Sequence, residues 1–220
     1  GIGAATAARL LREGACVVLA DRDAAAAEEV RAGFARQFGN DVVRAIACDV
    51  TDEAQVKAAF DYAAREFGGL DVLVANAGIA SSAPIEQTTV ELWDRNFDVL
   101  AQGYFLTSKH AWGLLKRMKA QGGTSVVFIG SKNAVAAAAG ASAYASAKAA
   151  ANHLARCLAL EGAPEGIRVN VVNPDAVIRG SKIWDGDWRK ERAASNKVDA
   201  GDELEAHYRN RSMLKRDVLP

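Results

Sequence analysis

Five short apolar runs alternate with longer helical stretches along this chain of 220 residues. Within each run the apolar residues are consecutive rather than alternating, which is typical of strands buried on both faces. We therefore expect strands at 15–20, 42–48, 70–75, 124–129 and 167–172. Strict alternation of strand and helix favours an α/β fold with a mostly parallel sheet and helices on both of its faces.

Glycines and capping residues bound the helices that connect these strands. Three helices are expected to end at Gly14, Gly39 and Gly68, and the third to begin after an N-cap at Thr51. Their predicted ranges are 3–13, 24–38 and 52–67. Two longer helices are predicted at 89–120 and 142–161.

Composition excludes several classes of function. Lys and Arg number 27 and Asp and Glu also number 27, so no charge excess favours nucleic acid or an anionic membrane surface. The chain lacks a membrane-spanning apolar run and a secretory signal, so we expect a cytoplasmic protein. The cysteines and histidines lack ligand-like spacing, and we expect no metal. Nothing argues for a second domain, so residues 1–220 are interpreted as one domain.

The segment 179–217, here called the lid segment, differs in composition from the rest of the chain. Of its 39 residues 18 are charged, and it contains Trp184 and Trp188. One interpretation is a solvated helical appendage. The other is a mobile substrate lid after the last strand, where open α/β sheets bind ligands.

The chain begins at Gly1-Ile2-Gly3, a glycine pair that opens a helix, without the strand that should precede it. We expect a fragment whose missing first strand would lie in mid-sheet and whose last helix and strand are also absent. Unpaired neighbouring strands would then make the isolated chain poorly stable.

Residues suited to a dinucleotide follow the strands. Glycines at a helix N-terminus let backbone N–H groups approach a pyrophosphate. Asp21, at the end of the next strand, can accept hydrogen bonds from both ribose hydroxyls and repel a 2′-phosphate, so NAD is favoured, although Arg22 softens this preference. Asp49 can reach an adenine amino group, and Gly78 permits close approach to a ribose. Each of these residues could instead be a turn signal only.

The strongest constellation is Ser131, Tyr144 and Lys148. Tyr144 and Lys148 are four residues apart on a predicted helix, so an ammonium lies near a phenol. A neighbouring cation favours the phenolate and thus general-base use near neutral pH. Ser131 follows a strand, where its hydroxyl could bind a substrate oxygen. These residues predict a catalytic site.

Together these motifs, with Asn173-Pro174, resemble the short-chain dehydrogenases/reductases over the whole chain. The resemblance implies a Rossmann-type doubly wound sheet truncated at both ends. It implies Tyr144 as acid/base, Lys148 on the nicotinamide ribose and Ser131 as substrate orienter. It implies that the remaining cofactor contacts come from Gly1, Ile2, Gly3, Asp21, Asp49, Val50, Asn76, Ala77, Gly78, Pro174 and Val177.

Two positions depart from the family pattern. Leu100 stands where the family usually has a catalytic Asn, which puts the usual proton relay from Lys148 in doubt; Asn96, one turn earlier, is an unproven substitute. Asp175 follows Asn173-Pro174 where glycine is commoner, and a carboxylate there could favour the oxidised cofactor.

Residues 130–134 and 173–184 resemble more closely the dehydrogenase domain of fusion proteins that join a rhamnulose-1-phosphate aldolase to a lactaldehyde dehydrogenase. That resemblance implies NAD-dependent oxidation of lactaldehyde to lactate in rhamnose catabolism, with a fused aldolase domain. The alternatives are an alcohol or polyol dehydrogenase and a non-catalytic NAD-binding scaffold. Substrate-gripping candidates are Lys132, Asn133 and Arg179. Long helices around Trp112 and His153 resemble those of the family's dimer interfaces, so we expect a homo-oligomer.

Overall fold

The computed structural model describes residues 1–119 and 123–220, and its strands pair in parallel in two sheets. In the first sheet, β1 (Val17–Asp21) pairs with β2 (Val43–Ala47). In the second, β4 (Thr124–Ile129) lies between β3 (Val72–Ala75) and β5 (Ile167–Val172). The five strands expected from the apolar runs are confirmed to within two residues at either end.

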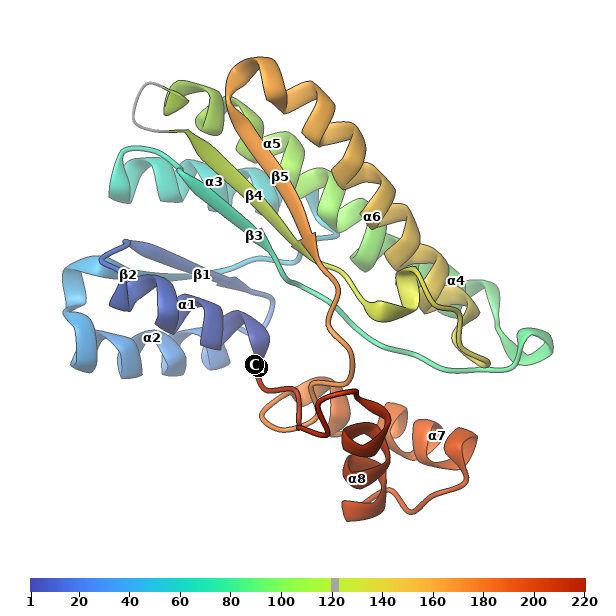
Figure 1. The fold of residues 1–220 in the computed structure, drawn as a ribbon. Coiled ribbons are helices and arrows are strands. Elements are labelled where there is room, and N and C mark those ends of the chain that lie inside the picture. The colour runs from blue at the N-terminus through green and yellow to red at the C-terminus, as the bar shows by residue number, and fades with distance from the viewer. Residues whose placement is uncertain (120–122) are drawn as a thin grey trace.

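Helices cover the strands on both sides (Figure 1). On one side, α1 (Ile2–Arg12) and α2 (Ala24–Phe38) pack against the β1–β2 pair. On the other side lie α3 (Glu53–Phe67), α5 (Gly103–Arg117) and α6 (Ser142–Gly162), of which α5 and α6 pack on the three-stranded sheet. The predicted α/β class with a doubly wound arrangement is therefore confirmed.

The long helix expected at 89–120 is wrong as a single element. It begins with α4 (Val90–Phe97), widens into the π-helical turn η3 (Asp98–Gln102), and continues as α5, which ends at Arg117. The N–H of Gly103 bonds the carbonyl of Asp98, five residues back, which is the π-helical spacing. Ala120 lies outside the described residues.

The N-cap of α3 also differs from the expectation. The Asp52 carboxylate accepts hydrogen bonds from the N–H groups of Ala54 and Gln55, at 2.9 and 3.2 Å. Thr51, which we expected to cap this helix, donates its hydroxyl to Asp49 at 2.8 Å. Both residues can cap, and the choice depends on backbone geometry that the sequence does not express.

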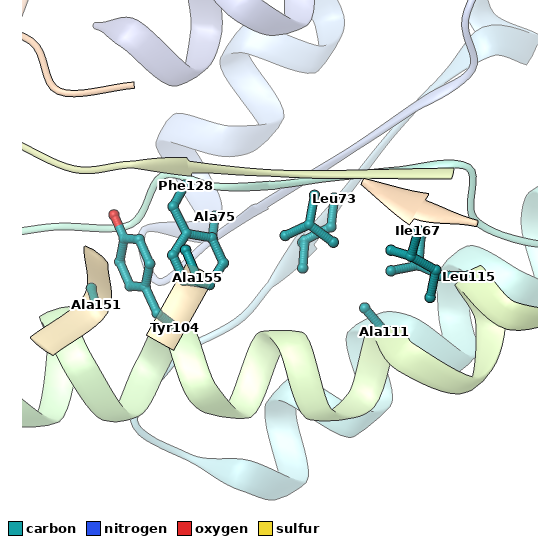
Figure 2. Close-up of a cluster of buried hydrophobic side chains, with 10 residues drawn as sticks. Leu73, Ala75, Tyr104, Ala111, Leu115, Phe128, Ala151, Ala155 and Ile167 are labelled. Atoms are coloured by element: carbon teal, nitrogen blue, oxygen red, sulfur yellow. The ribbon is translucent and has the colours of Figure 1, made fainter. Parts of the chain in front are cut away.

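The main core lies between the three-stranded sheet and α5 and α6 (Figure 2). Phe128 of β4 meets Tyr104 of α5 edge to face, with ring centroids 4.9 Å apart. The small residues Ala111 and Ala151 let the helices approach the sheet closely. This packing fixes the helices that present the residues of the site described below.

The lid segment contains a short turn, η7 (Lys182–Trp184), and the helices α7 (Asp187–Asn196) and α8 (Asp202–Arg211). Trp184, Trp188 and Leu204 are buried in one cluster with Leu100 and Tyr144. Burial of each large apolar side chain contributes about 1.5–3 kcal/mol to the free energy of unfolding. The segment is thus packed onto the rest of the chain rather than being fully solvated. None of the helices in the described ranges has the length and hydropathy to cross a membrane.

Candidate active site

A cavity of about 1410 Å³ runs past the carboxyl ends of the strands and between the facing edges of β1 and β3. Because parallel strands end at the same edge of a fold, residues far apart in sequence meet there. The predicted site residues that line it are Gly1, Ile2, Gly3, Asp21, Arg22, Asp49, Val50, Asn76, Ala77, Gly78, Ser131, Lys132, Asn133, Tyr144, Lys148, Pro174 and Val177.

The N-terminal end of α1 has the features of an anion cradle. Gly1 caps this helix without a side-chain hydrogen bond, so the first N–H groups have no side-chain acceptor. A Cβ on Gly3 would lie 2.6 Å from the Asn76 amide nitrogen, so a side chain there would force the Asn76 amide to move. The free N–H groups and the positive end of the helix dipole fit the pyrophosphate of a dinucleotide.

Two carboxylates lie further along the same cavity. Asp21 is exposed at the end of β1, and one of its oxygens accepts the N–H of Asp23 at 3.0 Å. One oxygen of Asp49 accepts both the N–H and the hydroxyl of Thr51, and these hydrogen bonds lower the pKa of Asp49. The Asp49 carboxylate is therefore ionised, and one of its oxygens is already hydrogen-bonded within its own turn. Asp21 is exposed and lines the cavity.

Ser131 and Tyr144 come together at the other end of the cavity. The N–H of Ser131 donates to Asn173 Oδ1 at 2.9 Å, and the hydroxyl of Ser131 accepts the N–H of Asn133 at 3.1 Å. A Cβ on Gly130 would lie 2.1 Å from the same Asn173 oxygen, so this position requires glycine. Burial raises the pKa of Tyr144, and a hydrogen bond with Ser131 opposes the rise.

Lys148 is buried, and its ammonium group is held from two sides. Nζ donates to Tyr104 Oη at 3.0 Å and to the carbonyl oxygen of Ile129 at 2.7 Å. Burial lowers the pKa of Lys148 to about 7. Tyr104 was not among the predicted site residues. The sequence signal that could have indicated it is its position, one turn after Leu100 on the same helical face.

Leu100 and Asn96 do not supply the amide expected near Lys148. Leu100 is fully buried, and its side chain lies 3.5 Å from where a Cβ on Gly78 would be. The Asn96 amide donates to Ser81 Oγ at 2.8 Å and to the carbonyl of Leu92 at 2.7 Å. Its amide nitrogen thus bonds its own helix and Ser81 rather than Lys148, and a relay role for Asn96 stays a prediction.

Two of the substrate-gripping candidates are held in ion pairs. Lys132 lines the cavity, but its Nζ lies 3.1 Å from Asp175. Arg179 lies outside this cavity and pairs with Glu205 at 2.9 Å and Asp217 at 3.5 Å. Arg179 as a substrate contact stays a prediction, although its guanidinium is engaged by carboxylates of the lid segment.

The lid segment contributes aromatic residues to the cavity that were not predicted as site residues. Trp184, Trp188 and Tyr208 line it, and the Trp188 ring centroid lies 5.6 Å from that of Tyr144. Arg192 lines it as well. Two tryptophans within a strongly charged segment were the available signal, since large aromatic residues in such a setting need a surface on which to pack.

The family model of the short chain dehydrogenases matches residues 1–185. The chain belongs to this family. Short-chain dehydrogenases are oxidoreductases, so this protein is an enzyme of that class.

Two curated relatives extend this assignment. The uncharacterized oxidoreductase YuxG of Bacillus subtilis is 45% identical over 221 residues, which cover 100% of this chain and 32% of YuxG. The D-threitol dehydrogenase of Mycolicibacterium smegmatis is 36% identical over 84% of this chain and 70% of its own length. This short-chain dehydrogenase thus spans about a third of the length of YuxG.

Solved structures of short-chain dehydrogenases share the fold. Sorbitol-6-phosphate 2-dehydrogenase SrlD from Erwinia amylovora aligns with a TM-score of 0.91 at 27% identity, over 100% of this chain and 84% of its own. A 3-ketoacyl-(acyl-carrier-protein) reductase from Brucella melitensis, complexed with NADH, aligns with a TM-score of 0.74 at 34% identity. The alignment covers 80% of this chain and 71% of the reductase. An NADPH-bound short chain oxidoreductase from Pseudomonas aeruginosa aligns with a TM-score of 0.81 at 26% identity. The alignment covers 96% of this chain and 76% of that oxidoreductase. The family therefore binds nicotinamide cofactors of both kinds.

Proposed function

We propose that this enzyme uses Ser131, Tyr144 and Lys148 to transfer hydride between NAD and a carbon that bears a hydroxyl group. The observation that carries the proposal is a single cavity that joins the glycine end of α1 to these three side chains. One end fits a pyrophosphate and the other presents a phenol, a hydroxyl and an ammonium. This is the set of groups that acid–base catalysis beside a nicotinamide requires.

Each of the three residues has a distinct role in this proposal. A nicotinamide cofactor, when bound, supplies the hydride acceptor. Tyr144 takes the proton of the substrate hydroxyl, and Ser131 holds the oxygen from which it leaves. Because burial raises the pKa of Tyr144, the phenolate needs a nearby cation, and Lys148, one turn further along α6, provides it while protonated.

For the substrate we favour a small polyol or secondary alcohol. The support comes from relatives whose names specify D-threitol and sorbitol 6-phosphate as substrates. For the cofactor we favour NAD, because the exposed Asp21 carboxylate lies in the cavity where it would repel a 2′-phosphate.

Oxidation of lactaldehyde is the second candidate, favoured by the resemblance of residues 130–134 and 173–184 to lactaldehyde dehydrogenase domains. The hydrated aldehyde would bind as a gem-diol, with Tyr144 taking one hydroxyl proton and Ser131 holding an oxygen. An aldolase domain joined to this one belongs to the same proposal, supported by the two thirds of YuxG that this chain leaves uncovered.

The test measures NADH and NADPH formation at the nicotinamide absorbance, with D-threitol, secondary alcohols and lactaldehyde as substrates. Tyr144→Phe should abolish turnover while NADH binding, followed by fluorescence, persists. Turnover by this variant would contradict the role of Tyr144. Turnover of lactaldehyde alone would favour the second candidate, and NADH binding without any turnover would indicate the non-catalytic scaffold instead.

A further inference from the structure

Arg192 is a buried cation in the wall of the active-site cavity. It lies in α7, is 7% exposed and lines the cavity. Its Nη1 donates to the carbonyl of Ala139 at 3.2 Å, and its Nε lies 3.5 Å from Tyr208 Oη. Within residues 1–119 and 123–220, no carboxylate lies within 4.0 Å of its guanidinium nitrogens.

Four of the five other arginines of the lid segment pair with a carboxylate, and the fifth, Arg216, is exposed to solvent. Each of the following pairs with an Asp or Glu: Arg179, Arg189, Arg209 and Arg211. Burial of a cation without a counter-charge costs free energy unless other groups compensate it. The two neutral oxygens and the Trp188 ring, whose centroid lies 5.4 Å from the guanidinium carbon, stabilise the charge without supplying a counter-ion, so this side chain is suited to receive an anion.

The position of Arg192 relative to Tyr144 indicates where that anion would lie. The Trp188 ring centroid is 5.6 Å from the Tyr144 ring, and the Arg192 guanidinium carbon is 5.4 Å from the Trp188 ring. The guanidinium and the phenol therefore both lie beside the indole ring of Trp188. A substrate whose reacting carbon is at Tyr144 could extend along Trp188 and reach Arg192 with its far end.

We propose that Arg192 binds an oxyanion of the substrate, a carboxylate or a phosphate monoester, at the end remote from the reacting carbon. The inference rests on the proposed function, because Tyr144 defines the reacting end. The guanidinium has five N–H donors in a planar fork that matches both oxyanions, and the two contacts to Ala139 and Tyr208 leave the Nη2 donors unengaged. Among polyols and secondary alcohols, this site then prefers those that carry an anionic group over neutral ones.

The experiment compares matched pairs of neutral and anionic probes on the whole natural protein in its NADH-bound form. The pairs are sorbitol and sorbitol 6-phosphate, glycerol and glycerol 3-phosphate, and butan-2-ol and 3-hydroxybutyrate. Calorimetry measures binding without the need for turnover. The wild type should bind at least one anionic probe about 10 to 100-fold more tightly than its neutral partner, the range for a charge-assisted hydrogen bond.

Arg192→Met should remove this difference and leave the neutral probes and NADH binding unchanged, and Arg192→Lys should restore part of it. The matched control is Lys190→Met on the same helix, because Lys190 is exposed and pairs only with Asp187; this variant should keep the wild-type preference. Equal binding within all pairs, or equal loss for both members in Arg192→Met, would overturn the inference. Failure of the proposed function is a separate result, namely no turnover of any bound probe with NAD or NADP.

Discussion

At the scale of single residues, Lys148 should make stability depend on pH. Its folded pKa is about 7, against 10.5 for the ordinary side chain. Between these values the unfolded chain binds a proton that the folded chain does not, so the free energy of unfolding rises with pH by about 1.4 kcal/mol per unit. Lys148→Met, which cannot titrate, should lack this rise, and urea unfolding from pH 7 to 9.5 measures both slopes.

The control for this prediction is Lys109→Met, since Lys109 is half-exposed and pairs with Glu53 on the surface. Its slope should equal that of the wild type. If the free energy of unfolding of Lys148→Met rises with pH as steeply as that of the wild type, the titration of buried Lys148 is not the cause of the pH dependence.

Tyr104 should hold the charged form of Lys148 through the 3.0 Å bond between Oη and Nζ. Tyr104→Phe removes this acceptor, which disfavours the ammonium, so the pKa of Lys148 should fall below 7 by about one unit. The rise in stability with pH should then start about one unit lower than in the wild type. An unchanged onset in a urea titration extended down to about pH 5 would show that the carbonyl of Ile129 alone holds Nζ.

At the scale of secondary-structure elements, the N-cap of α3 is testable because two neighbouring residues could supply it. Asp52→Ala removes two hydrogen bonds to free helix N–H groups and should lower the free energy of unfolding by about 1 kcal/mol. Thr51→Ala is the matched control and should have a smaller effect, because its hydroxyl bonds Asp49 rather than the helix. The denaturant midpoints of the two variants measure these effects. A larger loss of stability in Thr51→Ala than in Asp52→Ala would identify Thr51 as the N-cap.

The helices and strands themselves were largely predictable, because their signals are local. Consecutive apolar residues locate β3 and β4, and Gly39 ends α2 at a positive φ of 103°, which glycine adopts without strain. The π-helical turn was not predictable, because it depends on packing: a Cβ on Gly103 would lie 2.8 Å from Val50, on a different element. Local patterns do not contain such contacts.

At the scale of the whole molecule, the sequence predicted which strand ends converge but not which charged side chains pair with one another. Asp21, Asn76 and Ser131 line one cavity because parallel strands share a carboxyl edge, which topology alone implies. The pairing of Arg179 with Glu205 depends on how the lid segment folds back. Asp21, predicted at a strand end, is exposed and lines the cavity, and its role toward the cofactor is testable.

Asp21→Ser should shift the cofactor preference of the enzyme from NAD toward NADP. Removing the carboxylate ends its repulsion of a 2′-phosphate and leaves Arg22, which also lines the cavity, as a cation for that phosphate. We expect kcat/KM for NADP to rise about tenfold and that for NAD to fall, the change that about 1.4 kcal/mol of charge interaction gives. In the double variant with Arg22→Gln the gain for NADP should disappear while the loss for NAD remains. An unchanged ratio in Asp21→Ser would place the adenosine ribose elsewhere along the cavity, and the NAD preference would then need another residue to explain it.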